Sequence, residues 1–120
     1  MYEVNDSSVP RFLQGFFTFE GKGFEDPIPL DSSLRYVVPA GSTTQPVYFR
    51  GGNSTDAMIT VVLMRDGMPM RYFPIAAKGA VHVSLRVVED LLADTVLELF
   101  VAGPTDASGT VVVDLGMVEI

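Results

Sequence analysis

The sequence predicts an all-β fold, an antiparallel β-sandwich of immunoglobulin-like or jelly-roll type with about eight strands. The first observation behind this expectation is that short runs of β-branched and aromatic residues recur along the chain, separated by Gly, Pro, Asn and Asp. The second is composition, because 48% of the 120 residues are hydrophobic and 19% are charged, as in a folded globule. The third is that no heptad pattern or internal repeat competes with this interpretation.

One domain is expected, since 120 residues is a common domain size. We assign residues 11–120 to the sandwich, and residues 1–10 to a flexible N-terminal arm. In the first half of the chain, strands are expected at residues 12–19, 34–38 and 47–50. The Gly- and Asn-containing run at 51–56 predicts a turn that leads into the next strand.

The clearest strand covers residues 57–64, where a β-branched run with two apolar faces predicts a central position in a sheet. Asp66-Gly67 follows, a pair that favours tight hairpin turns, so residues 70–73 should return antiparallel. Pro69 and Pro74 bracket that return strand. Because proline cannot donate a hydrogen bond to a neighbouring strand, they predict that it lies at the edge of its sheet or that its paired part is short.

Residues 80–86 alternate between apolar and polar, which predicts a strand with one solvent-facing side and places His82 on that side. Residues 87–92 are expected to form one short helical turn. The adjacent acids Glu89 and Asp90 would lie near its N-terminus, where negative charge is favourable.

The last two strands are expected at residues 95–101 and 110–120. We expect them to pair as a second hairpin across the Gly- and Pro-containing loop at 103–109. Gly116, inside the last strand, predicts a bulge or a close approach of another group to the backbone.

The formal net charge of −7 opposes binding to nucleic acid or to an anionic membrane, since both attract clusters of basic residues. Residues 1–10 have neither the basic nor the apolar part of a targeting signal, and no apolar run approaches the roughly 20 residues of a membrane helix. The chain has no cysteine and cannot rely on disulfides. We therefore expect synthesis in the cytoplasm, with the protein kept there or incorporated into a particle such as a virion.

Few residues suited to catalysis are present, because the chain has one histidine, His82, and no cysteine. His82 has no apparent partner and is expected to be a solvent-facing polar residue. The acids Glu20, Glu25 and Asp26 lie among glycines but match no calcium-loop spacing. Asn53-Ser54-Thr55 matches the glycosylation pattern, yet it makes better sense as part of a turn. We expect a protein that is not an enzyme, with no catalytic residue, no metal site and no cofactor.

Two apolar groups exceed what a core strand explains. Methionines cluster around the Asp66-Gly67 turn, which would normally be polar, and phenylalanines crowd residues 12–24. Phe16 and Phe17 are adjacent, so they point to opposite faces of a strand, and both faces then need cover. The residues that we assign to an interface with another subunit are Phe16, Phe17, Phe24, Met68, Met70 and Tyr72.

The expected function is structural. We predict a homo-oligomeric subunit that contributes surface to a larger protein assembly, for example as a capsid decoration or another virion structural protein. One alternative is a carbohydrate- or ligand-binding module with exposed tyrosines for stacking, namely Tyr36, Tyr48 and Tyr72. A second alternative is an accessory subunit of an enzyme complex, whose arginines bind an anionic substrate. The arginines in question are Arg50, Arg65, Arg71 and Arg86, which more often form cross-strand ion pairs.

Overall fold

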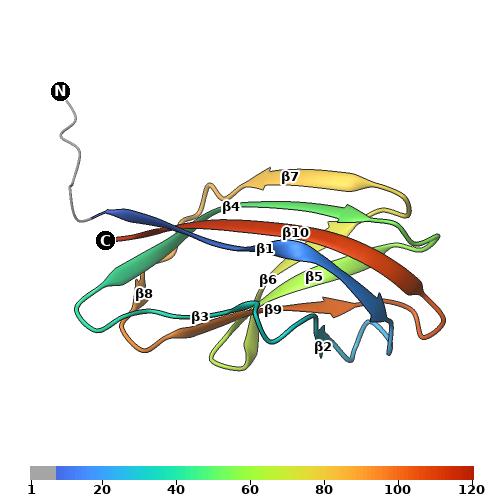
Figure 1. Cartoon of the computed structure of the whole chain (residues 1–120), viewed down its shortest axis with the longest axis horizontal. Coiled ribbons are helices and arrows are strands. Elements are labelled where there is room, and N and C mark those ends of the chain that lie inside the picture. Colours follow the sequence, from blue (N-terminus) through green and yellow to red (C-terminus); the bar gives the residue numbers. More distant parts are fainter. Residues whose placement is uncertain (1–7) are drawn as a thin grey trace.

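The computed structural model describes residues 8–120 as two antiparallel five-stranded sheets (Figure 1). Sheet A contains, in order, β1 (Val9–Glu20), β10 (Ser108–Glu119), β4 (Thr43–Asn53) and β7 (Ala80–Ser84), and β8 (Leu91–Leu92) also pairs with β4. Sheet B contains, in order, β2 (Ile28–Pro29), β9 (Val96–Ala102), β5 (Ile59–Arg65) and β6 (Met68–Ile75), and β3 (Arg35–Val37) also pairs with β9. The expected antiparallel β-sandwich is confirmed.

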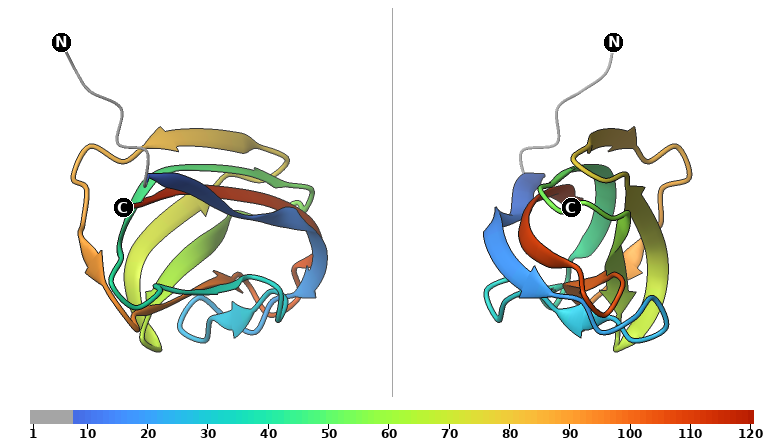
Figure 2. Two further views of the ribbon diagram at one scale, coloured as in Figure 1. Left: turned by 60° about the vertical axis from the view of Figure 1, so that its left-hand side comes forward. Right: turned by 90° about the vertical axis from the view of Figure 1, so that its right-hand side faces the viewer.

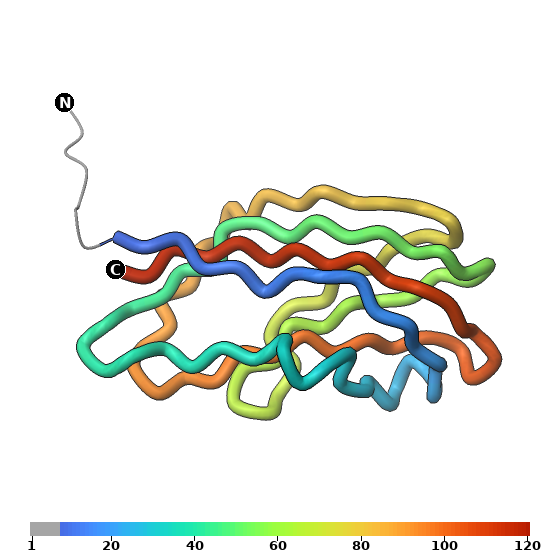
Figure 3. Tube along the Cα trace, viewed as in Figure 1, coloured from blue at the N-terminus to red at the C-terminus, as the bar shows by residue number. Residues whose placement is uncertain are grey.

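The strand pairing identifies the sandwich as a jelly roll. β5 and β6 form an inner hairpin, and β4–β7, β3–β9 and β1–β10 are antiparallel pairs nested outside it. Folding this nested hairpin over places β10 beside β4 and β9 beside β5, which creates the two sheets (Figure 3). Double-sheet jelly rolls are built in this way, whereas the immunoglobulin fold has a different strand order.

The core lies between the sheets, which Figure 2 shows as two layers from further directions. Phe49 of β4 and Phe73 of β6 stack across it, with ring centroids 4.3 Å apart and ring planes 8° apart. Aliphatic side chains from both inner faces surround this pair, and the largest fully buried ones include Ile59, Leu63, Leu97, Leu99 and Leu115. Burial of such side chains, at about 25 cal/mol per Å² of apolar surface, is the main force that holds the two sheets together.

β1 begins earlier than the sequence predicted. Val9 and Pro10, the last two residues of the expected arm, pair with Glu119 and Val118 of β10. Residues 1–7 of that arm lie outside the described part of the chain. β1 therefore spans 12 residues and pairs with β10 along its whole length.

β4 also extends further than expected, through Gly51 and Gly52, which the sequence analysis placed in a turn. These glycines pair with Val113 and Val112 of β10. The reason is packing, because a Cβ at Gly51 would lie 2.8 Å from side-chain carbons of Ile75 and Phe49. Glycine here leaves room for two core side chains, and the turn follows Asn53 instead.

The hairpin between β5 and β6 agrees with the sequence prediction. Asp66 and Gly67 both have positive φ, at 50° and 80°, as the favoured two-residue hairpin turn requires. β5 is central, with β9 and β6 on its two sides. β6 is an edge strand, as Pro69 and Pro74 predicted.

The helical turn expected at residues 87–92 is wrong. Leu91 and Leu92 instead form β8, which pairs with Thr44 and Thr43 of β4. β7 ends at Ser84 and does not reach the first residues of β4, whose backbone groups still need hydrogen-bond partners. β8 supplies these partners, and in this position Leu91 is fully buried. Along residues 8–120 there is no helix long and apolar enough to cross a membrane.

The second expected hairpin is also wrong, because β9 and β10 lie in different sheets. β9 pairs with β5 and β10 pairs with β4, and the loop at 103–107 crosses from one sheet to the other. Alternation of apolar residues shows that a segment is a strand but does not show which strand is its neighbour. The loop is also too long for a two-residue hairpin turn, which would have enforced local pairing.

Candidate functional site

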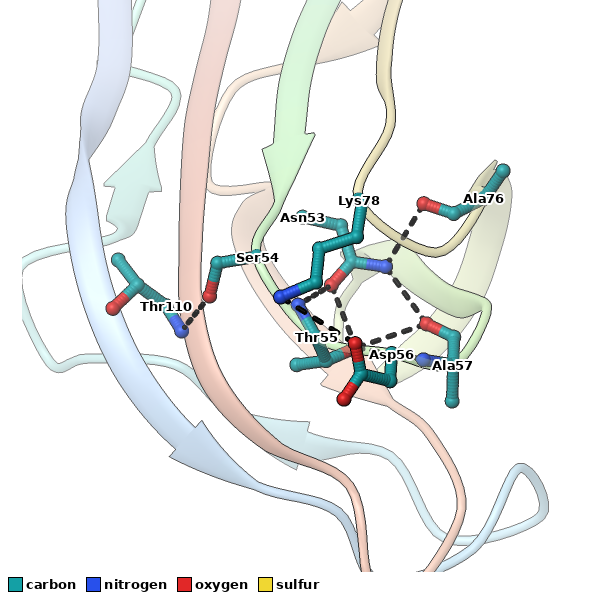
Figure 4. Close-up of polar contacts among 8 residues, drawn as sticks. All are labelled: Asn53, Ser54, Thr55, Asp56, Ala57, Ala76, Lys78 and Thr110. Carbon is teal, nitrogen blue, oxygen red and sulfur yellow. Dashed lines mark hydrogen bonds and ion pairs between the residues drawn. The ribbon is translucent and has the colours of Figure 1, made fainter.

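A buried polar network closes the end of the sandwich where β4 leads towards β5 (Figure 4). The side-chain nitrogen of Asn53 donates hydrogen bonds to the carbonyl oxygens of Ala57, Ile75 and Ala76, at 2.9, 3.2 and 3.1 Å. Its amide oxygen accepts hydrogen bonds from the backbone N–H and the hydroxyl of Thr55, at 2.9 and 2.8 Å. Asn53 is 5% exposed, and its side-chain amide is fully engaged. The network confirms the predicted local turn chemistry and leaves no free amide for glycosylation.

The rim of this network is polar and exposed. Asp56 forms an ion pair with Lys78 at 3.4 Å, and the hydroxyl of Ser54 accepts a hydrogen bond from the N–H of Thr110 at 2.8 Å (Figure 4). These contacts tie the turn to the neighbouring loop and to β10. They organise the fold locally.

A second polar cluster joins both sheets at the opposite end of β4. The carboxylate of Glu119 accepts hydrogen bonds from the Tyr36 hydroxyl at 2.6 Å and from the Arg11 guanidinium at 3.1 Å. The Tyr36 hydroxyl also lies 2.7 Å from Oγ1 of Thr44. Hydrogen bonds from Arg11 and Tyr36 hold the pKa of Glu119 below its ordinary value, whereas burial, followed by the bond to Glu119, raises the pKa of Tyr36. The cluster links β1, β3, β4 and β10, which is a structural role.

On the outer face of sheet A, Tyr48 lies flat against the backbone of Gly116. A Cβ at Gly116 would lie 1.9 Å from the tyrosine ring, and the β4–β10 register shifts directly after this glycine. Both features that the sequence predicted at Gly116, a bulge and a close approach, are therefore present. The Tyr48 hydroxyl donates to the carboxylate of Asp114 at 3.1 Å, which also receives a hydrogen bond from Arg50 at 2.9 Å. Burial and the bond to Asp114 raise the pKa of Tyr48.

His82 is exposed on this same outer face, as predicted. Its ring meets the ring of Tyr48 edge-on, with centroids 6.2 Å apart, and its cross-strand neighbour is Arg50. A general base needs a proton donor to act on and a group that orients it. Neither an acid nor a hydroxyl nucleophile is hydrogen-bonded to His82 among the residues described, so this arrangement suggests no catalytic centre.

The arginines do not form a shared anion site. Arg50 forms the cross-strand ion pair with Asp114, as the sequence analysis expected of such residues. Arg71 binds Glu89 at 2.6 Å, and Arg65 lies 3.9 Å from the same carboxylate. Glu89 thus bridges two strands of sheet B. The sequence analysis had instead placed it near the N-terminus of a helical turn.

The acids Glu20, Glu25 and Asp26 are all exposed in the segment that connects β1 with β2. Across residues 8–120, no group of three or more His, Asp or Glu side chains is placed to hold a metal ion. The three acids therefore form a solvated loop, with no cluster of oxygen ligands of the kind that Ca²⁺ requires.

The outer face of sheet B carries rows of mostly apolar residues. One row across the sheet contains Pro29, Phe100, Val62 and Tyr72, and a neighbouring row contains Ala102, Thr60 and Pro74. Val62 alternates with the core residues Val61 and Leu63 and is 0% exposed. The charged residues in the next row are Arg35 and Glu98. We call these residues the sheet-B face.

The comparisons with family models and curated proteins indicate no function for the sheet-B face. The chain matches no protein-family model, and no curated protein matches it. Function has to be inferred from the surfaces themselves.

The six residues assigned to an interface do not form one patch. Phe16 is 77% exposed on the outer face of sheet A, and Tyr72 is 62% exposed on the sheet-B face. Met68, at the β5–β6 turn, and Phe24, in the β1–β2 connection, are also exposed. Phe17 and Met70 instead face inward and pack against the core. We therefore do not include these two in a proposed interface.

Sequence reasoning missed part of the exposed apolar surface. Phe12, at 50% exposure, and Val112, at 52%, lie on the outer face of sheet A, and Phe100 belongs to the sheet-B face. The period-two alternation of residues 96–102 would have placed Phe100 opposite to Leu99 and Val101. The strand order that brings Phe100 beside Val62 and Tyr72 could not be derived from one sequence.

A groove runs between the edges of β6 and β7, where the sandwich is open on one side. Its volume is about 480 Å³, and its lining includes Arg71, Tyr72, Phe73, Leu85 and Arg86. Arg71 is occupied by Glu89 and by the carbonyl oxygen of Val87. The groove combines an exposed aromatic ring with two arginines.

Proposed function

We propose that this protein is a non-enzymatic structural subunit, which assembles with copies of itself and contributes surface to a larger particle, such as a virion. The observation that carries the proposal is the sheet-B face. An apolar row crosses the whole sheet from Pro29 through Phe100 and Val62 to Tyr72, with Pro29 and Tyr72 exposed at its two ends and Val62 buried. A contiguous apolar patch on a domain of this size marks an interaction surface or an aggregation site.

The residue types on the sheet-B face suit a protein partner. Aromatic residues and methionine are enriched at the centres of protein interfaces, and charged residues are depleted there. Tyr72 supplies a large exposed ring at the middle of β6. Jelly rolls are used for viral capsid proteins, and also for lectin domains and cupins, so the fold is compatible with the proposal without deciding it.

The test is the mass in solution over a concentration series, measured by sedimentation velocity and native mass spectrometry. The wild-type chain should form a defined oligomer. Tyr72→Lys should weaken association by about 30-fold, because loss of a buried aromatic anchor costs about 2 kcal/mol. The control is His82→Lys, which adds a lysine at an exposed strand position of the opposite sheet and should change the dissociation constant by less than about threefold.

Two results would contradict the proposal. One is a wild-type chain that stays monomeric at every concentration. The other is an oligomer whose stability is the same with Tyr72→Lys as with the control. In the second case the chain assembles through another surface, and the sheet-B face is not the interface.

A second function, binding of a carbohydrate or another small ligand, is favoured by the β6–β7 groove alone. Tyr72 is the tyrosine with a free ring there, since Tyr36 is engaged with Glu119 and Tyr48 lies over Gly116. A glycan array probed with the monomer would test it, with loss of signal expected in Tyr72→Ala. The enzyme-complex subunit has less support, because Arg50, Arg65 and Arg71 already face carboxylates and only Arg86 and Arg71 line the same groove.

A further inference from the structure

The two sheets end in four edges. Sheet A ends at β1 and at β7, and sheet B ends at β6 and at the strands β2 and β3. An edge strand exposes unpaired N–H and C=O groups that can pair with another chain. Proteins usually block such pairing with short strands, prolines, bulges or charged side chains.

Three of the four edges are blocked in these ways. β2 and β3 have 2 and 3 residues, and β7 has 5. β6 contains Pro69 and Pro74, and the β5–β6 register is interrupted by a bulge at Leu63/Met64. None of these edges offers a long, regular row of backbone groups.

β1 is different. It spans 12 residues, and its register with β10 runs without interruption from Val9 to Glu20. Its other side pairs with no strand of the described chain. Its one proline, Pro10, lies at the second position, and residues 12–19 carry no charge. Phe12 and Phe16 stand exposed on its outer face, at 50% and 77%.

We propose that β1 is the pairing edge for a second copy of this chain. Two β1 strands join antiparallel about a twofold axis perpendicular to the sheet. The two copies of sheet A then form one continuous sheet, in the order β7-β4-β10-β1-β1-β10-β4-β7. This inference rests on the proposed assembly function and adds a second contact between copies, at the β1 edge of sheet A, to the one proposed for the sheet-B face.

The chemistry of β1 matches its own antiparallel copy. With Gln14 opposite Gln14, Phe12 of each copy faces Phe16 of the other on the outer face, and aromatic cross-strand pairs are favourable. The acid at the end of the strand, Glu20, faces Ser8 of the other copy and is far from the other Glu20. A parallel arrangement would place the two acids side by side. Antiparallel pairing therefore keeps like charges apart in a chain whose net charge is −7.

The absence of cysteine makes a direct test possible, because a single introduced cysteine is the only thiol in the chain. Gln14→Cys should give a covalent dimer on mild oxidation, since paired residues of antiparallel strands have Cα atoms about 4.5–5.5 Å apart, within disulfide range. Ser84→Cys is the matched control. It is exposed on the outer side of sheet A, but at the blocked β7 edge, and should stay uncrosslinked.

Phe12→Cys and Phe16→Cys complete the series. If one of these variants crosslinks and Gln14→Cys does not, strand pairing is supported. The twofold axis then passes through the crosslinked residue of β1 and not through Gln14. An oligomeric protein in which none of the three positions crosslinks overturns the pairing, while the assembly function stands. A chain that is monomeric at every concentration overturns both.

Discussion

Replacing Asn53 with alanine should destabilise the fold by about 3 kcal/mol. Five hydrogen bonds converge on this side chain, three from its nitrogen to carbonyl oxygens and two to its oxygen from Thr55. In the variant, the Thr55 hydroxyl and the Ala57 carbonyl keep each other as partners, and the Ala76 carbonyl keeps the N–H of Gly79. The N–H of Thr55 and the carbonyl oxygen of Ile75 lose their hydrogen bonds to the side chain, and at about 1.5 kcal/mol for each the total is about 3 kcal/mol.

The measurement is equilibrium unfolding in urea, followed by far-ultraviolet circular dichroism because the chain has no tryptophan. The denaturation midpoint should fall with an unchanged slope, and the melting temperature should drop by about 10 °C. Ser54→Ala is the control in the adjacent position. It removes one exposed hydrogen bond to Thr110 and should cost less than about 1 kcal/mol. If the two variants are equally stable, the Asn53 network does not hold this end of the sandwich together.

Two further predictions concern the ends and the outer face of sheet A. Gly116→Ala places a Cβ 1.9 Å from the Tyr48 ring, so it should destabilise the folded state by about 1–3 kcal/mol. The double variant Gly116→Ala with Tyr48→Ala should recover part of this loss in the same urea assay. The folded-state pKa of Glu119 is lowered from 4.5, so its contribution to stability is complete above that pH and is lost as the pH falls through the lower folded value. Glu119→Gln should therefore flatten the decline in urea midpoint on the acid side, and an unchanged pH profile would contradict the assignment.

The local features of the fold could be derived from the sequence because short-range chemistry decides them. The turn at Asp66 and Gly67 needs two positive φ angles, which this residue pair favours. The prolines of β6 cannot donate hydrogen bonds to a neighbouring strand, and they therefore indicated an edge strand. Gly116 signalled the approach of another group, although Tyr48 as that group could not be named. Outward placement of His82 followed from alternation alone.

What the sequence did not reveal depends on contacts between distant segments. The position of β10 between β1 and β4, and not beside β9, is decided by how the whole nested hairpin folds over. The same limit applied to the surfaces. Phe16 and Tyr72 were both recognised as exposed, but only the strand order shows that they lie on opposite sheets, and that Phe100 joins Tyr72.

The central position of β10 in sheet A has a consequence for how the chain is made. β1 and β4 are the first long strands to be synthesised, yet each pairs with β10, which comes only at residues 108–119. Until the ribosome has passed those residues, β1 has no partner strand and β4 has an open edge on the side that β10 will occupy. The interval is one in which neighbouring nascent chains can meet through the wrong strands, a hazard common to proteins dominated by pairings between distant segments. For the proposed pairing of β1 with a second copy, the order of synthesis would thus become part of the control over which strands pair.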